Sequence, residues 1–190
     1  MTTQQFDTCT LDNGLRVVVQ SMPGMQSAAL TLMIPAGSVY DPDGKAGTTA
    51  ILSEIFSRGA GDLSARELSS AFDNIGLQRS VSGGVGYVTV SAATTADRIL
   101  DAVPLIAKML LKPHITPENF APSRELVHQA LNAMEDEPKQ RLGQYLRRCS
   151  YPTPFSNPSE GTMEDLPNVS IADVQSHFDS LIIPNDAVLG

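Results

Sequence analysis

Several residue types are scarce in this 190-residue sequence, which has no tryptophan, two cysteines and three histidines. Cys9 and Cys149 form no Cys-x-x-Cys motif, which argues against a zinc-thiolate knuckle and against a disulfide framework. We therefore expect two reduced, half-buried thiols. Residues 1–113 contain no histidine at all, so no zinc site that depends on histidine can lie in that part of the chain.

Basic residues are also few, with 13 Lys and Arg against 21 Asp and Glu and a net charge of −8. Nucleic-acid binding depends on clustered cations, and the only adjacent basic pair is Arg147-Arg148, so nucleic acid is excluded as a partner. No apolar run approaches the roughly 20 residues of a membrane span. Residues 1–5 lack the basic and apolar segments of a signal peptide, so a cytoplasmic location is expected.

What is present is the composition of an ordinary globular protein, 42% hydrophobic and 18% charged. Alternating and β-branched runs predict strands, and Asn13-Gly14 between the first two is a strong hairpin signal. The predicted strands cover residues 6–11, 15–19, 28–34, 77–82 and 86–92, and another begins at 186–189.

Apolar residues at helical spacing predict six helices. Ser64 and Ser170 are expected to cap two of them, Pro104 to kink or shift another, and Pro122 to interrupt a fourth. These helices cover residues 47–58, 64–76, 97–111, 118–134, 139–148 and 170–181. Because strands and helices do not alternate one for one, we predict an α+β fold, with helices on one face of an antiparallel sheet of about five to six strands.

Five stretches of the chain together resemble a known family. Residues 11–17 match a Leu-x-Asn-Gly-Leu-x-Val hairpin, and residues 36–41 match a Gly-Ser-x-x-Asp/Glu loop that precedes the helix at 47–59. Residues 161–166 and 184–189 resemble Gly-Thr-x-Glu-x-Leu/Ile and Pro-x-Asn-Ala-x-Leu. In this order they resemble the N-terminal domain of the inverted zincins, the family of pitrilysin, insulysin and the mitochondrial processing peptidases. The resemblance implies that residues 1–190 are one peptidase-like domain of a longer two-domain chain.

The resemblance also implies a zinc site whose residues this sequence lacks. Active members carry His-x-x-Glu-His, two zinc ligands and a general base on one helix face, and a third ligand from a Glu-x₆-Glu pattern. The two ligand positions and the base position fall on Ala50, Glu54 and Ser53. The third ligand position falls on Ala130 and its supporting acid on Ser123. One carboxylate cannot hold a catalytic zinc, so we predict no catalytic residue, no metal ligand and no cofactor in this chain, with zinc only in an active partner.

The remaining polar groups have ordinary interpretations. His128, near the third ligand position, is expected to be a helix-surface or half-buried residue rather than part of a relocated metal site, and Glu54 to be structural or solvated. The run from Glu135 to Glu137 predicts a solvated helix end. Asn168-Val169-Ser170 fits a glycosylation sequon but is more simply a loop and a helix cap. No serine lies in a Gly-x-Ser-x-Gly context that would favour nucleophilic catalysis.

Three hypotheses for function follow from the resemblance. The first is a non-catalytic subunit that completes a peptide-binding chamber with a catalytically intact partner, as a heterodimer or with its own C-terminal domain. An extended peptide would then dock on the strand edge at residues 78–82. The second is an active zinc metalloendopeptidase with an unconventional site or with a motif in a missing half. The third is a structural scaffold that binds no peptide.

Overall fold

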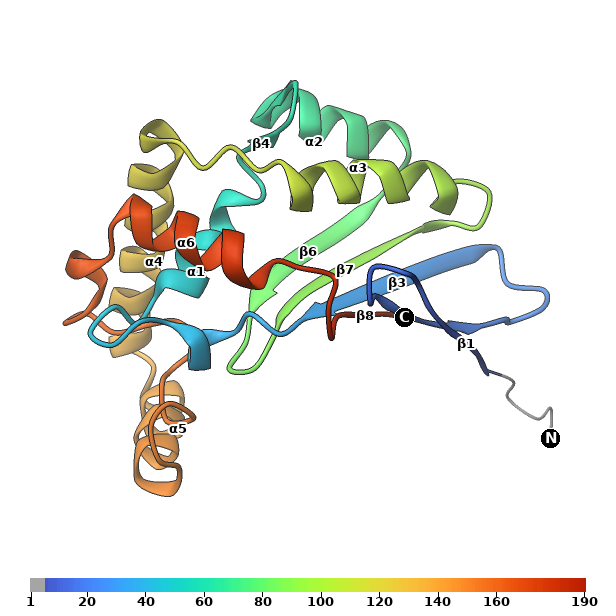
Figure 1. Ribbon diagram of the computed structural model, residues 1–190. Helices are drawn as coiled ribbons and strands as arrows, with labels where there is room; N and C mark the ends of the chain where they lie inside the picture. The colour runs from blue at the N-terminus through green and yellow to red at the C-terminus, as the bar shows by residue number, and fades with distance from the viewer. Residues whose placement is uncertain (1–5) are drawn as a thin grey trace.

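Six strands form the main sheet of the computed structural model, which describes residues 6–190. Their order across the sheet is β1-β2-β8-β3-β7-β6 (Figure 1). The strands are β1 (Phe6–Thr10), β2 (Arg16–Gln20), β3 (Ser27–Ile34), β6 (Gln78–Gly83), β7 (Val88–Thr95) and β8 (Val188–Leu189). Every predicted strand is present. The sequence pattern did not reveal a second, two-stranded sheet of β4 (Gly59–Ala60) and β5 (Leu63–Ser64).

The sheet is mixed rather than purely antiparallel, which corrects the prediction. β8 lies between β2 and β3, pairing parallel with β2 and antiparallel with β3. The other pairs in this sheet are antiparallel. An alternation of apolar residues reports that a segment is a strand but not which strand lies beside it, and β8 comes from the far end of the chain.

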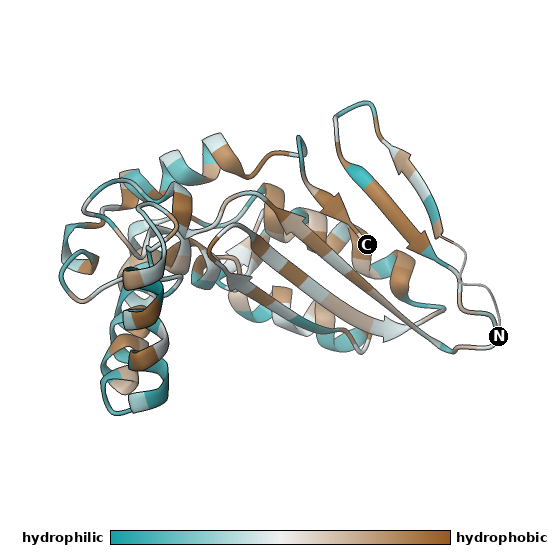
Figure 2. Ribbon diagram, turned by 90° about the horizontal axis from the view of Figure 1, so that it is seen from below, coloured by the Kyte–Doolittle hydropathy of each residue, from teal (hydrophilic) through white to brown (hydrophobic). Residues whose placement is uncertain are grey.

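The helices cover one face of the sheet, as predicted, and the view from below shows the other face uncovered (Figures 1 and 2). None of the helices between residues 6 and 190 combines the length and the apolar character needed to cross a membrane. The α-helices are α1 (Thr48–Ile55), α2 (Ala65–Asn74), α3 (Ile99–Leu111), α4 (Pro117–Glu135), α5 (Pro138–Ser150) and α6 (Ile171–Leu181), and the 3₁₀ turns are η1 (Ser38–Tyr40) and η2 (Leu166–Asn168).

Two prolines lie inside helices without ending them. Pro104 is in α3, which begins at Ile99 rather than at residue 97, and Pro122 is in α4, which runs without the predicted interruption. Each proline removes one bond to the carbonyl four residues earlier. For Pro104 that carbonyl belongs to Leu100, an exposed residue of α3.

The core surrounds α1, which packs against α4, α6 and β6. Ser64 and Ser170 form capping boxes at the starts of α2 and α6, which confirms both predicted caps. Cys9 and Cys149 are free thiols but exposed, so the expectation that they are half-buried was wrong. The fully buried core side chains include Ile51, Leu52, Ile55, Phe56, Leu68, Phe72, Val88, Val90 and Met109.

Candidate functional site

One face of α1 carries the three positions to which the family resemblance assigns the zinc motif. Ala50, Ser53 and Glu54 are three and four residues apart and therefore share a side of the helix. All three are half-buried, whereas the opposite side of α1 is fully buried in the core. The helix is thus held with this face directed away from the core.

The edge strand β6 ends against this face of α1. A Cβ placed on Gly83 would lie 2.8 Å from Thr49 Cγ2 and 3.1 Å from Ser53 Oγ, so the absence of a side chain permits the contact. The Ser53 hydroxyl donates to the Thr49 carbonyl at 2.9 Å. The strand that ends the sheet therefore runs up to the motif face.

The free edge of β6 presents backbone groups from alternate residues. The Gly84 N–H donates to the Tyr87 carbonyl at 2.7 Å, so the pair that follows Gly83 is hydrogen-bonded. Bonded and unbonded pairs alternate along an antiparallel ladder, which directs the N–H groups of Arg79, Val81 and Gly83 away from β7. An extended segment could pair with this edge.

The two α4 positions that the resemblance assigns to the third zinc ligand and its supporting acid, Ala130 and Ser123, differ in environment. Ser123 is completely buried, and its hydroxyl has no hydrogen-bond partner in the part of the chain that the structure describes. Ala130 lies about two turns further along the helix and is exposed. α4 packs directly on α1, so the helices that would carry the two halves of a zinc site are neighbours.

The residues at these five positions do not fit a catalytic zinc ion. Such an ion requires about three nitrogen, sulfur or carboxylate ligands, and Glu54 is the only residue of the five that offers one. Between residues 6 and 190 no three His, Cys, Asp or Glu side chains lie close enough to hold a metal ion. Glu54 forms no ion pair with any described residue.

A buried polar network supports the start of α1. Asp41 Oδ2 accepts from the Gly47 N–H at 2.9 Å, and Oδ1 accepts from the Thr49 N–H at 2.9 Å and from the Thr49 hydroxyl at 2.6 Å. His177 Nε2, from α6, lies 3.0 Å from the Ala36 carbonyl oxygen and 3.2 Å from Thr49 Oγ1. The network therefore ties α1 to α6 and to the end of β3.

Burial dominates the electrostatics of this network. It raises the pKa of Asp41 above its ordinary value, and the hydrogen bonds from Thr49 and Gly47 oppose only part of that rise. The sequence contained a partial signal, because Asp41 belongs to the recognised Gly-Ser-x-x-Asp loop. Nothing in the sequence indicated that His177 would join it.

The other predicted features lie where expected. His128 is half-buried on α4 and lies 3.2 Å from the amide nitrogen of Asn132. Glu135, Asp136 and Glu137 are exposed at the junction of α4 and α5, which confirms a solvated helix end.

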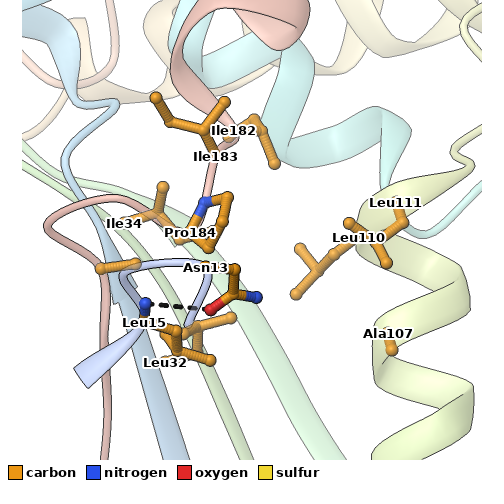
Figure 3. A pocket seen from close by; sticks show the side chains of 11 residues that line it. Asn13, Leu15, Leu32, Ile34, Ala107, Leu110, Leu111, Ile182, Ile183 and Pro184 are labelled. Carbon is orange, nitrogen blue, oxygen red and sulfur yellow. Dashed lines mark hydrogen bonds between the residues drawn. The ribbon is translucent and has the colours of Figure 1, made fainter. Parts of the chain in front are cut away.

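An apolar pocket of about 220 Å³ lies between the sheet, α3 and the segment that follows α6 (Figure 3). Asn13 is the only polar residue in its lining, and its Oδ1 accepts from the Leu15 N–H at 3.1 Å. The pocket offers apolar contact and no group for catalysis. The other lining residues are Leu15, Leu32, Ile34, Ala107, Leu110, Leu111, Ile182, Ile183, Pro184 and Ala187.

The fold is an α+β domain with helices on one face of a six-stranded sheet, and the five positions that the resemblance assigns to a zinc site hold residues that do not fit the metal. A family model described as insulinase, peptidase family M16, matches residues 16–162, and the chain belongs to this family. The uncharacterized zinc protease YmxG of Bacillus subtilis is 23% identical over 181 residues, which cover 95% of this chain and 44% of YmxG. A similarly described zinc protease of Mycobacterium leprae is 24% identical over 158 residues, which cover 83% of this chain and 36% of that relative. The chain thus spans less than half the length of these relatives.

Solved structures share the fold at low sequence identity. The peptidase M16 inactive domain of Pseudomonas fluorescens has a TM-score of 0.88 and 16% identity, covering 97% of this chain and 45% of that one. A protease of Helicobacter pylori has a TM-score of 0.89 and 19% identity, and the match covers 98% of this chain and 45% of the protease chain. At these identities the matches establish the architecture alone.

Proposed function

We propose that this chain is a non-catalytic member of the insulinase family that completes a peptide-binding chamber with a catalytically intact partner. The observation that carries the proposal is the α1 face, where Ala50, Ser53 and Glu54 stand at the ligand and base positions. An alanine offers no ligand, and a neutral serine hydroxyl is far too weakly basic to replace a carboxylate as general base. That one solved neighbour is described as an inactive M16 domain is consistent with this proposal.

The edge of β6 supports a role in holding peptide. β6 is the last strand of the sheet and ends at Gly83, directly against the α1 face. A peptide that added to this edge would be bound mainly by backbone hydrogen bonds, which depend little on its sequence. The chain would then hold an extended segment while the partner supplies zinc and base.

The partner is a catalytic subunit of the same family, in a heterodimer, or a C-terminal domain of the same polypeptide. The relatives' greater length supports the second arrangement, because this chain covers only 44% of YmxG. A cytoplasmic location stays a prediction.

The test is peptide cleavage by reconstitution. The purified protein, a family member with an intact His-x-x-Glu-His motif, and their mixture are each incubated with zinc and a fluorogenic unstructured peptide. We expect no cleavage by this chain alone and faster cleavage by the mixture than by the partner alone. Changing the partner's motif glutamate to glutamine should abolish the mixture's activity. Chelator-sensitive cleavage by this chain alone would instead support the peptidase hypothesis.

A copurification measurement separates the proposal from a purely structural scaffold. A chamber subunit should bind both the intact-motif partner and an extended peptide, whereas a scaffold should bind the partner and leave the affinity for peptide unchanged.

A further inference from the structure

Arg79 is held against a buried aromatic ring at the free edge of the sheet. Its Cζ lies 4.2 Å from the ring centroid of Phe72, which comes from α2 and is fully buried. Arg79 belongs to β6, the last strand of the sheet (Figure 1). Its partner on β7, Ala92, is buried, so the Arg79 side chain lies on the face that the helices cover. The packing therefore positions a guanidinium group beside the edge strand.

The charge of Arg79 has no matching carboxylate. Arg79 is half-buried and forms no ion pair with any described residue. Of the arginine side chains between residues 6 and 190, only that of Arg98 donates a hydrogen bond. Burial lowers the pKa of Arg79, and the charge of Asp73 opposes part of that change. Arginine stays ionised in proteins, so Arg79 offers a planar set of N–H donors that suits a carboxylate.

We propose that Arg79 selects, among extended peptides bound at the β6 edge, those with an acidic side chain opposite it. This inference rests on the proposed function, in which β6 holds peptide. The Arg79 N–H is directed to the free edge, so the residue opposite it in an antiparallel added strand forms a hydrogen-bonded pair with it. The two side chains then lie on the same face with their Cβ atoms about 5 Å apart, within reach of a carboxylate.

The rest of the edge extends the selection by one position. Val81 is half-buried on the same face and packs against the core, so the residue opposite it should be apolar. In an antiparallel strand that residue comes two positions before the acidic one. The β6 residues whose side chains lie on the other face are exposed and polar, and they favour no particular partner: Gln78, Ser80 and Ser82.

The net charge of the chain makes this preference diagnostic. At −8, the overall field of the protein attracts basic peptides and repels acidic ones. A preference for an acidic residue must therefore come from a local cation at the binding edge.

Fluorescence anisotropy with three labelled peptides tests the proposal. Each is an unstructured Ser/Thr peptide with a central valine and with glutamate, glutamine or lysine two residues after it. The glutamate peptide should bind the purified protein at least about threefold more tightly than the glutamine peptide, and the lysine peptide should bind most weakly. The preference should shrink as the salt concentration rises from about 0.05 M to about 0.5 M.

Two variants assign the preference to Arg79. Arg79→Met keeps an unbranched apolar chain against Phe72 and removes the charge, so it should bind the glutamate and glutamine peptides equally. Arg66→Met makes the same change of net charge at an exposed position in the first turn of α2, about 9 Å along the helix axis from Phe72. It should keep the full preference. Urea unfolding checks that both variants fold.

The outcomes separate this inference from the proposed function. If the unmodified protein binds the glutamate and glutamine peptides equally and Val81→Pro weakens both, the edge holds peptide but Arg79 does not select it. A glutamate preference that persists in Arg79→Met also overturns the inference, because another cation is then its source. Failure of all three peptides to bind overturns both the inference and the peptide-holding role of β6.

Discussion

Asp41 and Thr49 are joined by two hydrogen bonds to one carboxylate oxygen, at 2.9 Å from the Thr49 N–H and 2.6 Å from its hydroxyl. The other oxygen accepts from the Gly47 N–H. The first N–H groups of a helix have no partner within the helix, so this buried carboxylate satisfies the start of α1 from outside. The start of α1 is thus supported by Asp41, whereas the positions assigned to the zinc motif hold Ala50, Ser53 and Glu54.

Replacing Asp41 with Asn should destabilise the domain. The amide keeps the size of the side chain but has a single acceptor oxygen, so one buried N–H of α1 loses its partner. We expect the free energy of unfolding in urea to fall by about 1–3 kcal/mol. Asp43→Asn, two residues away and exposed, is the matched control and should change it by less than about 0.5 kcal/mol. Equal effects would show that Asp41 does not support the helix.

The stability conferred by Asp41 should depend on pH. Burial raises the pKa of Asp41 in the folded protein, which therefore holds that proton more tightly than the unfolded chain does. The stability that the protonated Asp41 adds to the folded protein is complete below the ordinary carboxyl pKa of about 4. It declines as the pH rises towards and through the raised pKa of Asp41 in the folded protein. The difference in unfolding free energy between the unmodified protein and Asp41→Asn should accordingly be larger near pH 4 than near pH 8. A difference that grows with pH would contradict the assignment.

Gly161→Ala should be among the most damaging substitutions outside the core. Gly161 has φ +86°, and a Cβ there would lie 2.6 Å from the Cα of Gly47 at the start of α1. Gly76→Ala separates the two causes, because Gly76 has φ +60° but open space around it. We expect losses of about 1–2 kcal/mol for Gly76→Ala from backbone strain alone and at least about 3 kcal/mol for Gly161→Ala, measured by thermal unfolding.

Val81→Pro should weaken peptide binding without unfolding the sheet. Its N–H points to the free edge of β6, where proline is tolerated and removes a donor to an added strand. Fluorescence anisotropy with a labelled unstructured peptide should show a loss of about threefold to tenfold in affinity. Ser80→Pro is the control, because Ser80 pairs with Ser91 of β7 and its substitution should lower stability instead. Unchanged affinity in Val81→Pro would place the peptide elsewhere.

Local signals in the sequence were sufficient for most of the fold. Asn13-Gly14 marked the first hairpin, and Ser64 and Ser170 marked helix starts, because turns and caps depend on a few adjacent residues. Pairing between distant segments has no such signal, so the parallel placement of β8 beside β2 was missed. The interruption predicted at Pro122 was wrong for a related reason, since whether a proline breaks a helix depends on what satisfies one carbonyl group elsewhere in the fold.

The candidate site was predictable only in part. The resemblance located Ala50, Ser53 and Glu54, and the structure places them together on the accessible face of α1. The contact between Asp41, Thr49 and His177 joins residues up to 136 positions apart, so it could not be derived from spacing along the chain. The same holds for the close approach of Gly83 to Ser53, which sets the edge of β6 beside the motif face.

Zinc stoichiometry, measured by elemental analysis after zinc loading and extensive washing, tests the central claim most directly. The positive control is the variant A50H/E54H/A130E. It places histidines at two half-buried positions of α1 and a glutamate at an exposed position of α4, and it should retain zinc. The unmodified protein should retain almost none under the same conditions. A tight, one-to-one zinc in the unmodified protein would contradict the account, because the true ligands would then lie outside the α1 and α4 positions.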